Sequence, residues 1–104
     1  MTQLLVNHRP INLYTGVPQK EELQVYKVPM GQGVVITQLI LNNPEDTESA
    51  VTLTINTQDV AVFTLAGKET KITNIYLVLK SDDYVALQQT EGGKISVSLN
   101  GSIA

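Results

Sequence analysis

The stretch Val51-Thr52-Leu53-Thr54-Ile55-Asn56 alternates apolar and polar residues at every position. Successive side chains of a β-strand point to opposite faces, so this alternation predicts a strand with one apolar and one polar face. The two-residue period continues through most of residues 25–99, with Gly, Pro, Asn and Asp at the breaks. Such a pattern is typical of an antiparallel sheet with one buried face.

Strands are predicted at 23–26, 34–42, 51–56, 60–65, 72–79, 84–88 and 95–100. The third and fourth of these are joined by the short link Thr57-Gln58-Asp59, which favours a hairpin. Turns recur often enough to indicate a sandwich or a barrel, and no helix longer than one turn is expected. We therefore predict an all-β chain, an antiparallel β-sandwich of about seven or eight strands, for which a jelly roll is one arrangement.

The chain has 104 residues, enough for one hydrophobic core. Residues 1–22 lack sustained alternation and contain Pro10 and Pro18. We predict an N-terminal arm or edge strands over residues 1–22, with short strands at 4–6 and 11–14, and a β-sandwich domain over residues 23–104. Such an arm could lie along its own sheet or add to the sheet of a neighbouring subunit.

Residues 34–42 form the most apolar run. Strict alternation would place Val34, Ile36 and Ile40 on one face and Val35, Leu39 and Leu41 on the other. A run that is apolar on both faces predicts a central strand, or a strand whose second face meets a partner.

The composition disfavours several classes of partner. Charged residues make up 16% of the chain, the net charge is −3, and the few Lys and Arg residues are scattered, so we expect no nucleic-acid binding. The run at 34–41 is too short to cross a bilayer, and the N-terminus resembles no secretory signal. We expect no membrane insertion and synthesis in the cytoplasm. The chain contains no Cys, which excludes disulfides and thiolate metal sites.

No catalytic constellation is visible. His8 is the only histidine, so neither a Ser-His-Asp array nor a zinc site is supported, and we expect His8 on the surface. Two loops carry hard oxygen ligands, without the spacing of an EF-hand. These residues are Asn42, Asn43, Glu45, Asp46 and Glu48 in one loop and Asp82 and Asp83 in the other. We predict no catalytic residues, no cofactor and no metal site.

The outward strand positions are filled mainly by Thr, Gln, Asn and Ser. Neutral polar side chains can be covered by a neighbour without desolvating an ion, which suits a surface buried in an assembly. The same composition also fits an ordinary soluble domain of low charge. Among the aromatic residues, Phe63 is expected in the core, whereas Tyr26, Tyr76 and Tyr84 are candidate contacts for a ligand or partner. Tyr26 and Tyr76 could together form a platform for a sugar.

Two stretches resemble the layout of small structural proteins of tailed bacteriophages. Residues 26–31 (YKVPMG) match a Y-x-V-P-x-G turn, and residues 36–43 (ITQLILNN) match the I-T-x-L-x-L-x-N strand that follows it. Further on, residues 79–85 match an L-x-x-x-D-x-hydrophobic step, and residues 95–101 match a final I-S-V strand. The phage chains usually have Gly immediately before the Asp of that step, where this chain has Ser81-Asp82-Asp83.

The resemblance implies a virion component of the tail, baseplate, head decoration or fibre, built as a β-sandwich and assembled as a symmetric oligomer. It carries no catalytic motif. We therefore expect a non-enzymatic structural protein of the virion, made in the host cytoplasm, that forms a homo-oligomer and contacts other virion proteins. The alternative is a carbohydrate- or receptor-binding β-sandwich module that recognises a host-surface glycan.

Overall fold

The computed structural model describes residues 9–90 and 92–103, and these residues form strands, turns and loops. Among them there is no helix long and apolar enough to cross a membrane. The strands are β1 (Arg9–Gly16), β2 (Leu23–Lys27), β3 (Val34–Asn42), β4 (Ser49–Ile55), β5 (Gln58–Leu65), β6 (Thr70–Leu79), β7 (Tyr84–Gln89) and β8 (Ser96–Ile103).

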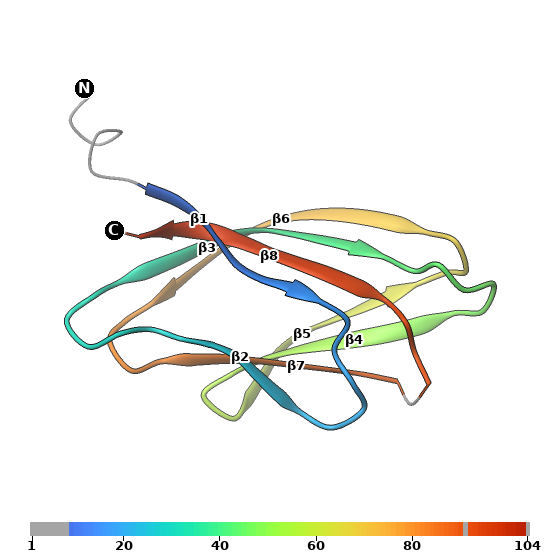
Figure 1. Cartoon of the computed structure of the whole chain (residues 1–104), viewed down its shortest axis with the longest axis horizontal. Coiled ribbons are helices and arrows are strands. Elements are labelled where there is room, and N and C mark those ends of the chain that lie inside the picture. Colours follow the sequence, from blue (N-terminus) through green and yellow to red (C-terminus); the bar gives the residue numbers. More distant parts are fainter. Residues whose placement is uncertain (1–8, 91, 104) are drawn as a thin grey trace.

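The strands form two antiparallel sheets that face each other (Figure 1). Sheet A has the strand order β1-β8-β3-β6, and sheet B has the order β2-β7-β4-β5. Consecutive strands alternate between the sheets, except that β4 and β5 form a hairpin within sheet B. An eight-stranded double sheet with this order is a jelly roll. The predicted fold class and the predicted hairpin are both confirmed.

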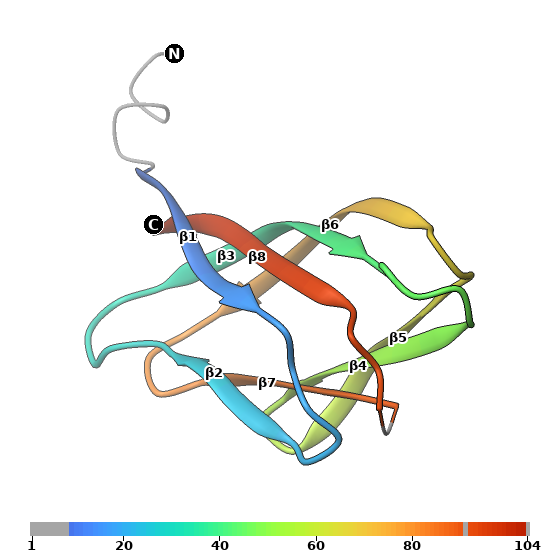
Figure 2. The same cartoon turned by 45° about the vertical axis from the view of Figure 1, so that its right-hand side comes forward.

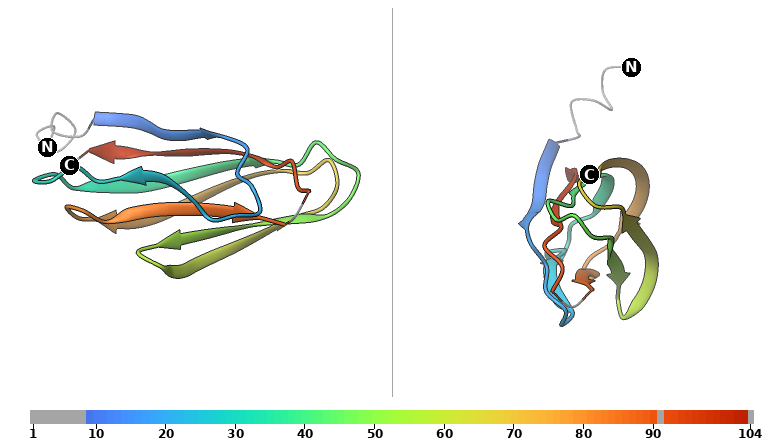
Figure 3. Two further views of the ribbon diagram at one scale, coloured as in Figure 1. Left: turned by 60° about the horizontal axis from the view of Figure 1, so that its bottom comes forward. Right: turned by 90° about the vertical axis from the view of Figure 1, so that its right-hand side faces the viewer.

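The first strand of the sandwich lies beside the last one. β1 lies at one edge of sheet A and pairs antiparallel with β8 of the same chain (Figures 2 and 3). Residues 9–16 are thus an edge strand of this sandwich and include the predicted strand at 11–14. The predicted strand at 4–6 and His8 lie outside the described residues.

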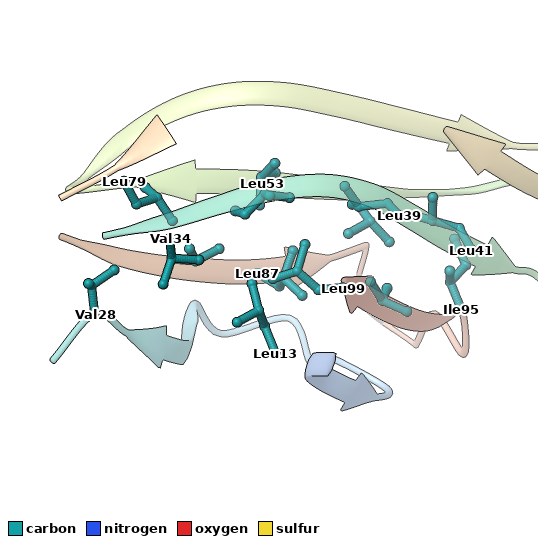
Figure 4. Close-up of a cluster of buried hydrophobic side chains, with 14 of the residues drawn as sticks. Leu13, Val28, Val34, Leu39, Leu41, Leu53, Leu79, Leu87, Ile95 and Leu99 are labelled. Atoms are coloured by element: carbon teal, nitrogen blue, oxygen red, sulfur yellow. The ribbon is translucent and has the colours of Figure 1, made fainter. Parts of the chain in front are cut away.

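The core lies between the two sheets, where side chains from both layers meet (Figure 4). The strands predicted at 51–56 and 95–100 were expected to turn their apolar residues inward. Five of these six residues are buried, namely Val51, Leu53, Ile95, Val97 and Leu99, and Ile55 is partly buried against the same core. Phe63 is partly buried and packs against the same cluster, as predicted. The apolar period of the sequence therefore identified the core sides of β4 and β8.

A bulge in β3 overturns the predicted faces of this strand. Ile36 pairs with Gly101 of β8 and Gln38 pairs with Asn100, so Thr37 is an extra residue with no partner on β8. One extra residue reverses the alternation beyond it. The core side of β3 therefore carries Val34, Ile36, Leu39 and Leu41, and the outer side carries Val35, Gln38 and Ile40. The placement of Ile40 with Val34, and of Leu39 and Leu41 with Val35, was wrong.

The β4–β5 turn also differs from its predicted position. It consists of Asn56 and Thr57, which have φ values of 51° and 71°. Positive φ at both central residues of a two-residue hairpin defines a type I′ turn, whose twist matches that of the strands. Gln58 and Asp59, predicted as part of the link, begin β5 instead.

Buried carboxamides fasten the loops at one end of the sandwich. Asn43 Nδ2 donates to the carbonyls of Thr47 (2.8 Å) and Ala66 (3.1 Å), and its Oδ1 accepts from the Glu45 N–H (3.1 Å). Gln89 Nε2 donates to the Ile95 carbonyl, and its Oε1 accepts from the Ile95 N–H. These side chains supply hydrogen bonds that buried loop backbone would otherwise lack.

Candidate functional site

Each of the three strand pairs of sheet A contains a register shift, and the three shifts lie at the same height across the sheet. Leu13 is the extra residue of β1 against β8, and Thr37 is the extra residue of β3 against β8. Against β6, Thr37 faces two residues, Ile75 and Tyr76. Bulges bend a strand and increase its twist, and here they lie side by side across the whole sheet.

At this level the outer face of sheet A is hollowed into an open groove of about 600 Å³. Its lining is uncharged and comes from all four strands. The lining residues are Pro10, Ile11, Asn12, Thr37, Gln38, Asn74, Asn100, Gly101 and Ser102.

Four of these residues form a row across the sheet, one from each strand. Asn12 pairs with Asn100, Asn100 pairs with Gln38, and Gln38 pairs with Asn74. We call Asn12, Asn100, Gln38 and Asn74 the carboxamide row. Since neighbouring strands lie about 4.8 Å apart, the row extends over about 14 Å.

The row is hydrogen-bonded at the β1 end and open at the β6 end. Asn12 Nδ2 donates to Asn100 Oδ1 at 2.9 Å, and Asn100 Nδ2 lies 3.5 Å from Gln38 Oε1. Within the described part of the chain, the side chain of Asn74 makes no hydrogen bond. A carboxamide offers one acceptor oxygen and two N–H donors, so this end of the row can pair with groups that both donate and accept.

An exposed aromatic side chain lies beside the open end. Tyr76 is two residues from Asn74 on the same face of β6, and 73% of its surface is exposed. Ile72 and Val78 continue this face and are 62% and 69% exposed. The groove and its β6 border thus combine neutral hydrogen-bonding groups with an apolar surface.

The three tyrosines singled out in the sequence do not form one site. Tyr76 borders the groove on sheet A, whereas Tyr26 and Tyr84 lie on β2 and β7 of sheet B. Tyr26 is half-buried and packs against the core. The structure therefore does not bring Tyr26 and Tyr76 together into a platform.

The β2–β3 and β6–β7 turns, which contain two of the patterns noted in the sequence, contact each other. The Val28 N–H donates to the Asp83 carbonyl at 2.9 Å, and the Asp82 N–H donates to the Val28 carbonyl at 3.1 Å. Ser81 Oγ accepts from the Gly31 N–H at 3.0 Å. These residues connect the β2–β3 and β6–β7 turns, so the pattern marks a structural junction between turns.

Asp83, in one of the two acidic loops, stabilises the turn in which it lies. Asp83 accepts hydrogen bonds from the Lys80 N–H (2.9 Å) and from Asn56 Nδ2 (2.8 Å). These bonds favour the charged carboxylate and hold the pKa of Asp83 below its usual value. Among residues 9–90 and 92–103, no three His, Cys, Asp or Glu side chains are grouped so that they could hold a metal ion.

Sequence reasoning missed the carboxamide row. The sequence showed that the outward positions are neutral. The four residues of the row, however, are widely separated in the chain, from Asn12 to Asn100. Their alignment depends on strand order and on the bulges, and alternation alone specifies neither.

Comparison with known proteins supports the fold. The chain matches no protein-family model and no curated protein. Among solved structures it is similar to the CBM36-1 domain, a carbohydrate-binding module, of a multidomain xylanase from the hindgut metagenome of Trinervitermes trinervoides. That match has a TM-score of 0.52 and 13% identity, and it covers 94% of this chain and 97% of the domain.

The chain is also similar to Eiger TNF from S. frugiperda, with a TM-score of 0.45 and 16% identity over 73% of this chain and 60% of that one. At 13% identity, the likeness to the CBM36-1 domain shows the fold alone, a β-sandwich.

Proposed function

We propose that this protein is a non-enzymatic binding module that recognises a neutral carbohydrate in the groove on sheet A. The observation that carries this proposal is the carboxamide row, with the exposed ring of Tyr76 beside its open end. The partner is a carbohydrate, as in the alternative considered from the sequence. The site differs, because it lies on the outer face of sheet A and is not a platform of Tyr26 and Tyr76.

The chemistry of the groove matches that of a sugar. Sugar hydroxyls both donate and accept hydrogen bonds, as carboxamides do. The faces of a pyranose ring carry C–H groups, which pack on an aromatic ring such as that of Tyr76. The groove lining has no charged side chain to attract or repel an ionic group.

The likeness to a carbohydrate-binding module is compatible with this proposal but gives only the fold, because function depends on the residues of the site. The groove is open, so an extended polysaccharide could lie along the row. The ligand we expect is therefore a neutral polysaccharide chain.

The test is affinity electrophoresis in gels that contain xylan, hydroxyethylcellulose, mannan or polygalacturonate. We expect retardation by at least one of the three neutral polymers and none by polygalacturonate. Asn74→Ala and Tyr76→Ala should each weaken binding about three- to tenfold, which corresponds to one lost hydrogen bond or ring contact.

Gln24→Ala is the matched control, because Gln24 is an exposed carboxamide on β2 of the other sheet. It should bind like the parent protein. The proposal is overturned if no neutral polymer retards the protein, or if both groove variants bind as well as the control.

The second candidate is the one implied by the phage resemblance, a structural subunit of a virion. The exposed side chains of Ile72, Tyr76 and Val78 along β6 favour this second function, because such a surface is suited to burial in an assembly. Its tests are the neighbourhood of the gene and mass spectrometry of purified particles. Head or tail genes beside it, with the protein in the particle, would support this function, and sugar-utilisation genes would count against it.

A further inference from the structure

The four edges of the sandwich are unequally protected against strand addition. An edge strand presents unpaired backbone N–H and C=O groups, and proteins usually guard them with Pro, charges, bulges or short strands. The edges are β1 and β6 in sheet A and β2 and β5 in sheet B. The edge with the weakest guard indicates where another strand can pair.

Three edges are guarded by Pro, by a charged residue or by a short strand. β1 contains Pro10 and the bulge at Leu13. β2 has only five residues and ends in Lys27. β5 carries Asp59 next to an irregular step in its pairing with β4.

β6 has the weakest guard, a bulge at Ile75–Tyr76 with no Pro or charged residue beside it. With ten residues it is the longest strand of the sandwich, and residues 72–79 (ITNIYLVL) contain neither Pro nor a charged residue. Its outward side chains are exposed and mainly apolar, and its only charge is Lys71, whose Nζ lies 3.3 Å from the Thr64 carbonyl. The bulge at Ile75–Tyr76 divides β6 into two halves of similar length.

We propose that β6 pairs antiparallel with β6 of a second copy of this chain, so that two copies of sheet A form one continuous sheet. A two-fold axis near Ile75 would place Ile72 of one copy beside Val78 of the other, apolar against apolar. Such an interface is self-complementary and closes as a dimer. No charge on residues 72–79 opposes this contact, although the whole chain carries a net charge of −3.

The edge is large enough for such a contact. A strand of ten residues is about 34 Å long, and a two-layer edge with its outer side chains is roughly 20 Å thick. The covered area is then on the order of 700 Å² per copy, close to the ~800 Å² of a standard interface. Edge pairing leaves the outer face of the sheet open, so this proposal does not rest on carbohydrate binding.

The test is sedimentation equilibrium of the full chain, without polysaccharide, from 1 to 500 µM. We expect a mass that rises from 11.3 kDa to twice that value. The double variant Ile72→Lys/Val78→Lys, which places charges on the edge, should remain a monomer throughout. Met30→Lys, at a position 82% exposed in the β2–β3 turn, should dimerise like the parent protein.

Hydrogen exchange provides a second measurement. Amide protection in β6 should increase with protein concentration, whereas protection in the edge strand β1 should not change. Circular dichroism must show that the double variant is folded. A mass of one chain at 500 µM, a trimeric mass, or a dimer that persists in the folded double variant would overturn the proposal.

Discussion

Asp82 occupies a backbone conformation that favours glycine. Its φ is 70°, in the left-handed region, and it lies immediately before Asp83 in the β6–β7 turn. A left-handed conformation costs an L-residue about 1–2 kcal/mol, and Asp tolerates it better than most residues. Asp82 therefore adopts the geometry that the turn needs at some cost in stability.

Asp82→Gly should stabilise the protein by about 0.5–1 kcal/mol, because relief of the left-handed strain exceeds the greater freedom of Gly in the unfolded chain. Urea denaturation would measure this change. Asp82→Ala removes the same charge without relieving φ and should not stabilise the fold. Equal stabilisation by both substitutions would assign the effect to charge instead.

Asp83 should make stability depend on pH. Its folded pKa is lowered by the hydrogen bonds from the Lys80 N–H and Asn56, so its contribution is fully present above the unfolded pKa of about 4. That contribution is lost as pH falls through the lower folded pKa. Thermal unfolding from pH 6 to 2 should show a decrease below pH ~4, which should be smaller in Asp83→Asn. An unchanged profile in this variant would contradict the assignment.

At the scale of the elements, the bulges of sheet A depend on Gly101. A Cβ at this position would lie 2.1 Å from the Val35 carbonyl oxygen and 3.2 Å from Ile36 Cα. Backbone at such distances cannot yield as a side-chain end can. The close approach of β8 to β3 beside the bulge at Thr37 therefore requires glycine.

Gly101→Ala should destabilise the protein by about 1–3 kcal/mol, as overpacking of a buried position does. It should also disturb the groove and weaken polysaccharide binding in the same gels. Gly92→Ala offers a comparison, because a Cβ at Gly92 would contact no other atom, whereas its φ of 79° is unfavourable for alanine. That variant should lose stability while its binding stays unchanged. Parent-like stability of Gly101→Ala would contradict the argument.

The same bulges mark the limit of prediction from the sequence. Alternation identified seven of the eight strands and the core sides of β4 and β8, because the period of two reflects burial directly. It failed in β3, where Thr37 reverses the alternation and every β3 position is apolar except Thr37, Gln38 and Asn42. An apolar run on both faces contains no signal for a bulge. The groove follows from that bulge, so it was equally invisible.

At the scale of the whole molecule, charge and the proposed binding face are separated. Within the described residues, most charged side chains lie in the loops and turns, among them Glu45, Asp46 and Lys68. Asp46 and Lys68 form an exposed ion pair at 3.8 Å. The groove lining and the carboxamide row carry no charge. The net charge of −3 therefore comes mainly from the loops and turns, and the groove on sheet A is neutral.

Binding at such a face should be insensitive to salt. The Debye length falls from about 30 Å at 0.01 M to about 3 Å at 1 M ionic strength, which removes long-range effects of the loop charges. We expect the affinity for a retarding neutral polysaccharide to change less than twofold between these two NaCl concentrations. The measurement is isothermal titration calorimetry with the polymer selected by electrophoresis. A tenfold loss of affinity at high salt would mean that charged loops make the contact, and the site would then lie outside the groove.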